Sequence, residues 1–341
     1  MKYRFITGSY ASAGEPGVCL IRYDPEAGFQ IEEAYHGFVN PSFVAVHPEK
    51  PMAYAVEEAC PEGAVHVVRW DGGRLESLQT FPTGGGDPCH LSLSKDLRRL
   101  YAANYTTGSL AVFLLDETGM ILERGCVRQH IGRGAHPQRQ EGPHVHFSME
   151  KDGKLYVCDL GLDKVVVYEE REGALYETGH IPFPPASGPR HLAACDAFPE
   201  RLYCASELNS QVYVLERRDE NNYGIIQHVS TLPPACPENN TTAAIRFSPD
   251  GRILMVSNRG YDSIAAFKVD QEGRLSGPAV SRCVAQPRDF IAVGGDVIVG
   301  SQRDSVIHAY RMNRETLRLE DTGWELKLPR PTCITPCNWE K

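Results

Sequence analysis

The stretch TAAIRFSPDGRILMVSNRGYDSIAAF, residues 242–267, reads as strand, tight turn, strand, polar turn and strand. Its first turn is Pro249-Asp250-Gly251, and such a turn between two apolar runs is a strong hairpin signal. The same pattern recurs along the chain at intervals of 44 to 55 residues. The other copies begin at Pro41, Pro88, Pro143, Pro189 and Pro287, and a truncated copy begins at Pro331. The sequence is therefore a repeat whose unit contains several short strands.

A period near ~45 residues with several short strands per unit is typical of a β-propeller. The copies predict four strands per unit, so we expect an all-β fold of four-stranded blades. The last copy stops after one strand, 331–338, while the N-terminus offers two strands without partners, 3–10 and 18–23. The two chain ends are therefore expected to share one blade, which removes open sheet edges. Six full copies and one shared copy predict a seven-bladed β-propeller, with residues 1–341 forming a single domain.

Composition limits the partners that we expect. The formal net charge is −9, which argues against nucleic acid or a membrane surface as a partner. The N-terminus lacks the apolar stretch of a signal peptide, and no apolar run approaches the ~18 residues of a membrane span. None of the 11 cysteines forms a CxxC pair, so we interpret them as reduced, buried residues. These features predict a cytoplasmic protein, and nothing in the sequence predicts its oligomeric state.

Antiparallel pairing predicts where functional side chains gather. The innermost strand of a blade starts on the face of the ring to which the second strand returns, so these two ends are neighbours on one rim. The repeat framework holds Val, Leu, Ala and Tyr, whereas these rim slots hold imidazoles, guanidinium groups and carboxylates. The candidate site residues on this rim are Asn104, His144, His146, Asp159, Arg190, His191, Glu207, Arg259 and Arg288.

Each of these residues allows more than one interpretation. His144 and His146 are two apart and point to one face of a strand, so they could be a general base and its helper, two metal ligands, or partners of local backbone groups. His144 is favoured because it directly follows Pro143, closest to the mouth of the ring. Arg190 and Glu207 could be a structural ion pair, or a substrate clamp with a catalytic carboxylate. Arg288 could simply pair with Asp289.

Five motifs follow one another in chain order. They are Gly142-Pro143-His144-Val145-His146, Gly188-Pro189-Arg190-His191, Glu207-Leu208-Asn209-Ser210, Ser257-Asn258-Arg259-Gly260 and Pro287-Arg288-Asp289-Phe290. Together they resemble the signatures of the seven-bladed propeller lactonase family. That family includes a 6-phosphogluconolactonase type and the fungal carboxy-cis,cis-muconate cyclase. The resemblance implies catalytic roles for His144, Arg190, Glu207 and Arg259. The sixth copy departs from the pattern, because Val293-Gly294-Gly295-Asp296 is shorter than the usual Pro-Asp-Gly turn.

Lactone hydrolysis needs a base that activates water and a cation for the developing oxyanion. In the expected scheme His144 is the base, one of Arg190 and Arg259 stabilises the oxyanion, the other holds an anionic group, and Glu207 orients a neighbour. His146, His191, Arg288, Asp159 and Asn104 are expected to bind substrate, without a metal or cofactor. The expected substrate is a small anionic lactone, 6-phosphoglucono-1,5-lactone, giving 6-phosphogluconate in the pentose phosphate pathway. The alternatives are a hydrolase or cyclase acting on another sugar or muconate-type lactone, and a non-catalytic propeller that binds a small anion or a protein.

Overall fold

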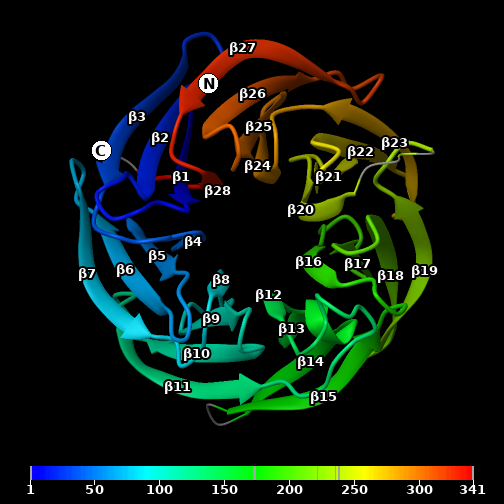
Figure 1. Cartoon of the computed structure of the whole chain (residues 1–341), viewed down its shortest axis with the longest axis horizontal. Helices are drawn as coiled ribbons and strands as arrows, with labels where there is room; N and C mark the ends of the chain where they lie inside the picture. The colour runs from blue at the N-terminus through cyan, green and yellow to red at the C-terminus, as the bar shows by residue number, and fades with distance from the viewer. Residues whose placement is uncertain (1, 172–173, 221, 235, 237–238, 340–341) are drawn as a thin grey trace.

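The computed structural model describes residues 2–171, 174–220, 222–234, 236 and 239–339. Seven four-stranded antiparallel sheets stand around a central axis like the blades of a fan, as Figure 1 shows. The prediction of an all-β, seven-bladed propeller is therefore confirmed.

The blades follow one another in chain order, each numbered from its innermost strand outward. They are β4 (Val44–Val46), β5 (Met52–Glu57), β6 (Ala64–Trp70) and β7 (Leu75–Pro82); β8 (Pro88–Leu93), β9 (Arg99–Asn104), β10 (Ser109–Leu115) and β11 (Ile121–Gln129); β12 (Val145–Lys151), β13 (Lys154–Asp159), β14 (Lys164–Arg171) and β15 (Ala174–Pro182); β16 (Pro189–Ala193), β17 (Arg201–Ser206), β18 (Gln211–Asp219) and β19 (Asn222–Ser230); β20 (Thr241–Phe247), β21 (Ile253–Arg259), β22 (Ser263–Val269) and β23 (Leu275–Arg282); β24 (Pro287–Val293), β25 (Asp296–Ser301), β26 (Val306–Met312) and β27 (Leu319–Lys327).

The seventh blade joins the two ends of the chain. Its strand order is β28 (Pro331–Pro336), β1 (Tyr3–Ser9), β2 (Val18–Asp24) and β3 (Gly28–Tyr35), so the last strand of the chain is the innermost. The pairing of β28 with β1 sets Thr7 opposite Ile334 and Phe5 opposite Pro336. The predicted closure by a shared blade is thus confirmed. The N-terminal part supplies three strands instead of the two predicted. The third strand, β3, was not predicted because it is partly exposed and lacks a strong apolar pattern.

The strands differ in burial according to their position in the blade. In β13 the four residues Leu155–Cys158 are all buried, because both faces of the blade pack against neighbouring blades. On the outer strand β11, by contrast, most residues are exposed or half-buried. Apolar clusters therefore lie between adjacent blades, and one of them joins Tyr54 of β5 to Phe113 of β10. The ring is stabilised blade against blade, as expected for a repeat whose units bury their faces on each other.

A β-bulge recurs near the start of the innermost strand. Cys89, His146, Arg190 and Arg288 are each the extra residue of such a bulge, skipped by the pairing with the second strand. A bulge bends the strand and re-aims a side chain, and bulges are frequent next to active sites. The same structural position in four blades thus holds a thiol, an imidazole and two guanidinium groups.

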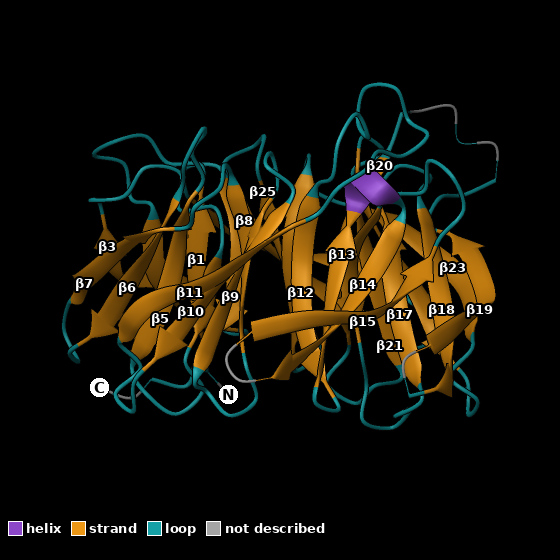
Figure 2. Cartoon of the chain, turned by 90° about the horizontal axis from the view of Figure 1, so that it is seen from below, coloured by secondary structure: helices purple, strands orange, loops and turns teal. Residues whose placement is uncertain are grey.

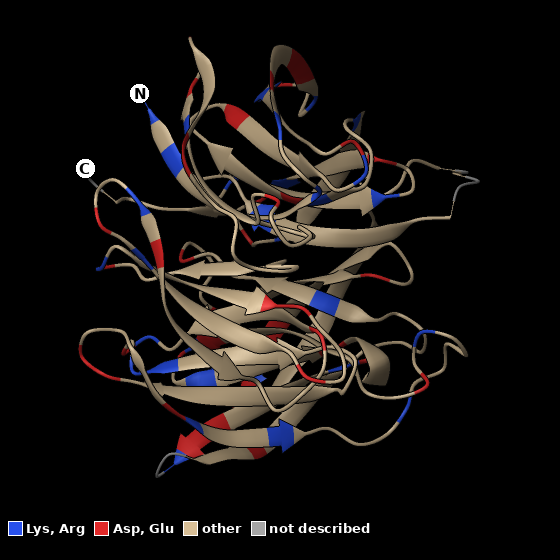
Figure 3. Ribbon diagram, turned by 60° about the vertical axis from the view of Figure 1, so that its left-hand side comes forward, with Lys and Arg blue, Asp and Glu red and all other residues tan. Residues whose placement is uncertain are grey.

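The two faces of the ring differ. Figure 2 shows both chain ends on one face, while the short 3₁₀ helix η1 (Leu160–Leu162), which directly follows β13, lies on the other. Lys, Arg, Asp and Glu are interspersed along loops and strands in the view of Figure 3. Within the described part of the chain, no helix has the length and apolar character needed to cross a membrane.

Candidate active site

A pocket of about 320 Å³, here called the axial pocket, lies on the rim where the innermost strands begin and the second strands end. Small-ligand sites have volumes of roughly 300–1,000 Å³. Every blade contributes to the wall, which is lined by Tyr10, Glu58, Cys89, Tyr105, Arg139, His146, Glu207, Arg259 and Arg288. The pocket is therefore a product of the closed ring.

Three larger hollows among the described residues, of about 650, 680 and 430 Å³, lie elsewhere on the molecule. The first lies beside hairpin turns, and its charged residues Arg314 and Asp250 already pair with each other at 2.7 Å. The second is lined by the first and last strands near the chain ends, with Arg4 bound to Glu32 at 2.6 Å. The third is lined by Arg99 and Asp96, which pair at 3.0 Å. The axial pocket, in contrast, combines side chains from all seven blades, so we place the candidate site there.

Two repeated positions build most of the pocket wall. The first is the bulge, which supplies Cys89, His146 and Arg288. The second is the end of the second strand, which supplies further side chains. These are Tyr10 after β1, Glu58 after β5, Tyr105 after β9, Glu207 after β17 and Arg259 at the last residue of β21. The wall thus follows the rim geometry predicted from the sequence.

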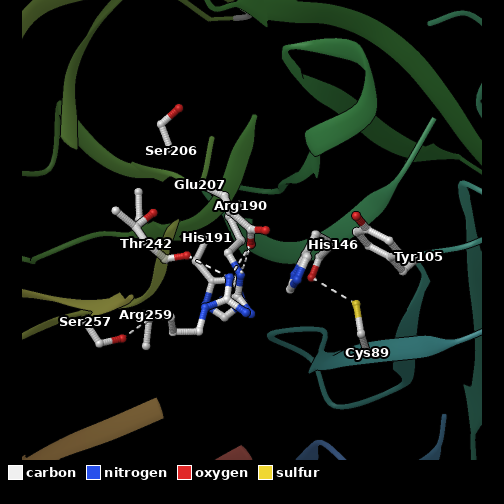
Figure 4. A network of polar contacts seen from close by, with 12 residues as sticks. Cys89, Tyr105, His146, Arg190, His191, Ser206, Glu207, Thr242, Ser257 and Arg259 are labelled. Carbon is white, nitrogen blue, oxygen red and sulfur yellow. Dashed lines mark hydrogen bonds and ion pairs between the residues drawn. The ribbon is translucent and has the colours of Figure 1, made fainter. Parts of the chain in front are cut away.

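Glu207 is the centre of the polar network in Figure 4. Its Oε2 accepts from Arg190 Nε and from Arg259 Nη2, both at 2.8 Å, and its Oε1 accepts from Arg139 Nη2 at 2.6 Å. Arg139 Nη2 also donates to the Tyr105 hydroxyl at 3.1 Å. One carboxylate thus orders three guanidinium groups that come from three different segments of the chain.

Burial and charge set the protonation of this network. Burial alone would raise the pKa of Glu207, but Arg259 and Arg190 hold that pKa well below its usual range. Burial, reinforced by Arg259, lowers the pKa of Arg190 to about 10. At neutral pH Glu207 is therefore ionised and Arg190 is charged, so the network keeps more positive than negative charge.

His146 is the imidazole of the pocket wall. It is 5% exposed, and its Nδ1 makes no hydrogen bond to the residues that the structure describes. Burial, together with the nearby Arg190, lowers the pKa of His146 well below its ordinary value. His191 packs beside it with ring centroids 5.3 Å apart, and burial lowers the pKa of His191 as well. His146 is thus an uncharged imidazole that can accept a proton.

His144 lies outside the pocket lining. Its Nδ1 donates to the backbone oxygen of Tyr105 at 3.0 Å, and its Nε2 lies 3.4 Å from Glu141 Oε1. Its ring stacks on the Tyr105 ring with centroids 4.5 Å apart. His144 lies outside the lining because the innermost strand of its blade is shifted in register. Val145 pairs with Asp159 at the place where Pro189 pairs with Ser206 in the next blade. His146, and not His144, therefore occupies the position that Arg190 and Arg288 hold in their blades.

Four further predicted residues lie outside the pocket lining, namely Asn104, Asp159, Arg190 and His191. Arg190, 2% exposed, is held by Glu207, and its Nη1 lies 3.1 Å from His191 Nε2. Asp159 is fully buried and braces the rim, accepting from the backbone N–H groups of His144 and Leu162 at 2.9 and 3.0 Å. Its other oxygen lies 2.6 Å from His130 Nδ1.

Asn104 is also fully buried, and its Nδ2 donates to Ser109 Oγ at 3.1 Å inside the same blade.

Of the nine predicted site residues, the structure brings four to the pocket surface, namely His146, Glu207, Arg259 and Arg288. Asn104, Asp159 and His191, expected to bind substrate, lie beside neighbouring protein groups outside this lining.

Sequence reasoning missed five lining residues, which are Tyr10, Glu58, Cys89, Tyr105 and Arg139. Four of them occupy the two repeated positions, so a strict reading of the repeat could have found them. Arg139 comes from the connection between β11 and β12, where the copies beginning at Pro88 and Pro143 are 55 residues apart. That long spacing indicated an insertion, but not that its arginine reaches Glu207.

The described residues contain no group of three or more His, Cys, Asp or Glu side chains arranged to hold a metal ion.

Replacing Glu207 with glutamine is expected to lower the free energy of unfolding by about 3–5 kcal/mol, because it leaves the buried Arg190 without its counter-charge. Urea denaturation at pH 7 measures this loss. Since the pKa of Glu207 is depressed in the folded protein, its stabilisation is present above the ordinary glutamate pKa of about 4.3 and is lost as the pH falls below it. The difference between the two proteins should therefore shrink in acid.

The exposed rim carboxylate Glu141 offers a matched control, because Glu141→Gln should change stability by less than about 0.5 kcal/mol. Equal stability of Glu207→Gln and the parent protein at pH 7 would show that the network does not stabilise the fold.

Known proteins resemble this chain over nearly its whole length. Residues 4–336 match the family model described as lactonase, 7-bladed β-propeller. A 6-phosphogluconolactonase of Bacillus subtilis is 31% identical, with 98% of each chain covered. Among solved structures, a Bacteroides fragilis protein described as a candidate 6-phosphogluconolactonase has a TM-score of 0.91 at 26% identity, with 99% of this chain and 98% of that chain covered. A periplasmic gluconolactonase of Pseudomonas aeruginosa has a TM-score of 0.89 at 26% identity, with 99% of each chain covered.

The family match, the shared ring and the arginine-rich axial pocket agree with one another. The chain belongs to the lactonase family of seven-bladed β-propellers.

Proposed function

We propose that this protein hydrolyses 6-phosphoglucono-1,5-lactone to 6-phosphogluconate. The observation that carries the proposal is an uncharged imidazole, His146, in the wall of a pocket that also contains Arg139, Arg259 and Arg288. A base beside several guanidinium groups suits hydrolysis of an ester whose substrate and transition state are both anionic. The 31% identical Bacillus subtilis 6-phosphogluconolactonase supports this choice of substrate.

In the proposed reaction His146 takes a proton from water as the water oxygen attacks the lactone carbonyl carbon. The carbonyl oxygen becomes an oxyanion, and Arg259 stabilises it. Arg259 lines the pocket, and its bond to Glu207 holds its guanidinium group in place for this role. The ring C–O bond then breaks, and His146 returns the proton to the leaving oxygen. This gives a hydroxyl group and a carboxylic acid that ionises.

The roles first expected for His144 and Arg190 pass to other residues in this scheme. Both nitrogens of His144 have protein neighbours, so we propose that it holds Tyr105 in place. Arg190 holds Glu207, and Glu207 orients Arg139 and Arg259.

The proposed substrate also bears on where the protein acts. A doubly charged phosphate ester does not cross a bilayer unaided, so we propose that an enzyme for this substrate acts in the cytoplasm.

Hydrolysis of freshly generated 6-phosphoglucono-1,5-lactone, corrected for its spontaneous hydrolysis, tests the proposal. We expect kcat/KM within the ordinary enzyme range of about 10⁴–10⁸ M⁻¹ s⁻¹. Glucono-1,5-lactone and a muconate-type lactone serve as comparison substrates, and the phosphorylated lactone should be preferred. If none of the three lactones is hydrolysed faster with the protein than without it, the proposed activity is absent.

The fall of kcat/KM at acid pH should be centred below pH 6.5. His146 must be unprotonated to act as the base, and its pKa in the free enzyme is depressed below the ordinary value of about 6.5. kcat/KM reports groups of the free enzyme, so it should stay level as the pH is lowered from 7.5 through 6.5. Initial rates between pH 5 and 7.5 measure this. A fall in kcat/KM centred at or above pH 6.5 would assign the base to another group.

A further inference from the structure

The pocket has two chemically different walls. Tyr105, His146, Glu207 and Arg259 come from four consecutive blades, β8–β11 through β20–β23, and form the wall that carries the proposed chemistry. The remaining three blades, β24–β27, the shared blade and β4–β7, supply the opposite wall. That wall consists of Arg288, Tyr10 and Glu58.

Arg288 differs from the other arginines of the site. Arg139, Arg190 and Arg259 each donate to Glu207, whereas Arg288 makes no hydrogen bond or ion pair within the described part of the chain. Its guanidinium carbon lies 5.1 Å from the centre of the Tyr10 ring, which packs against it. The bulge at the start of β24 places Arg288 at the pocket wall. A guanidinium group thus lies in the pocket with its N–H donors uncommitted.

Glu58 and Tyr10 complete this wall. The Tyr10 hydroxyl donates to Glu58 Oε1 at 2.8 Å, and Ser42 Oγ donates to Glu58 Oε2. Each carboxylate oxygen can accept a second hydrogen bond, so Glu58 remains an acceptor for ligand hydroxyl groups. A cation beside a hydroxyl acceptor suits a ligand that carries an anionic end group next to alcohol groups. A muconate-type lactone lacks such alcohol groups, whereas a phosphorylated sugar lactone has both.

We propose that Arg288 binds the phosphate group of the substrate and that Glu58, fixed by Tyr10, accepts from the adjacent sugar hydroxyl. This assignment rests on the proposed function and adds to it the residue that selects a phosphorylated substrate. The planar fork of a guanidinium group matches two phosphate oxygens. With the phosphate at Arg288, the lactone ring extends toward His146 and Arg259 on the opposite wall.

The test compares two substrates and three proteins. Arg288→Gln should lower kcat/KM for 6-phosphoglucono-1,5-lactone by about 10- to 100-fold, the range for loss of a charge-assisted hydrogen bond. It should change kcat/KM for unphosphorylated glucono-1,5-lactone by less than about 3-fold. The control is Arg303→Gln, because Arg303 is 60% exposed on the same rim and lies outside the pocket lining. That control should handle both lactones like the parent protein.

Calorimetric titration separates this proposal from the proposed function. The product 6-phosphogluconate should bind the parent protein at least about 10-fold more tightly than gluconate, and Arg288→Gln should abolish that difference. This readout needs no turnover, so it holds even if the enzyme hydrolyses a different lactone. Equal losses on both lactones, or equal binding of both acids by the parent protein, would overturn the phosphate site while leaving lactone hydrolysis intact.

A second variant provides a test of Arg288 in case Arg288→Gln does not fold. Arg288→Lys keeps the charge but not the fork, and it should retain part of the preference for the phosphorylated acid. If Arg288→Gln does not fold, a full preference retained by Arg288→Lys would still count against the proposed two-oxygen contact.

Discussion

His146→Ala is expected to lower kcat for lactone hydrolysis by about 100-fold or more, the usual effect of losing a general base. The imidazole lines the pocket, its Nδ1 has no partner among the described residues, and its depressed pKa keeps it unprotonated at neutral pH. Because alanine leaves Arg139 and Arg259 in place, KM should change much less than kcat. Steady-state rates, corrected for spontaneous hydrolysis, measure the effect.

The neighbouring histidine provides a matched control for this prediction. His144 is two residues away on the same segment, yet its ring stacks on Tyr105 outside the pocket lining. His144→Ala should therefore lower kcat by less than about 10-fold. Melting curves of both variants confirm that the fold is kept. The reverse order, with the larger loss in His144→Ala, would return the catalytic role to His144.

Cutting the chain after Arg330 is expected to abolish the soluble, cooperatively folded protein. The cut removes β28, so the inner edge of β1 loses its partner strand and the core loses the buried residues Cys333 and Ile334. An open strand edge is also a template for aggregation. Solubility and thermal unfolding of the purified chain measure the effect.

A chain that ends at Trp339 keeps β28 and serves as the control, with an expected melting temperature within a few degrees of the parent protein. If the chain cut after Arg330 stays soluble and unfolds at the same temperature, ring closure does not depend on β28.

Much of this architecture could be predicted from local sequence. Turns such as Pro249-Asp250-Gly251 mark the hairpins, and the incomplete copy at Pro331 indicates a blade shared with the N-terminus. Antiparallel pairing then brings the rim slots together, which is why Glu207 and Arg259 could be placed in one site without coordinates. These predictions depend on repetition, which a single sequence displays directly.

The choice between His144 and His146 could not be made in the same way. Pro143 resembles Pro189 in sequence, but in the structure Val145 takes the place of Pro189 in the pairing with the second strand. A shift of two residues keeps both side chains on the same face of the strand, so periodicity cannot detect it. Arg139 was missed for a related reason, because the position of a loop side chain depends on contacts between blades and not on the repeat.

The sharing of Glu207 by three arginines also bears on how the product leaves. Hydrolysis turns an uncharged lactone ring into a carboxylate, so the product carries one more negative charge than the substrate. Guanidinium groups that serve the reaction would also hold this new carboxylate, and slow release limits turnover in many enzymes. Glu207 already accepts from Arg139, Arg190 and Arg259, and it is itself ionised. In the proposed reaction the nascent carboxylate therefore meets a permanent competitor for the same donors, and this competition favours its departure.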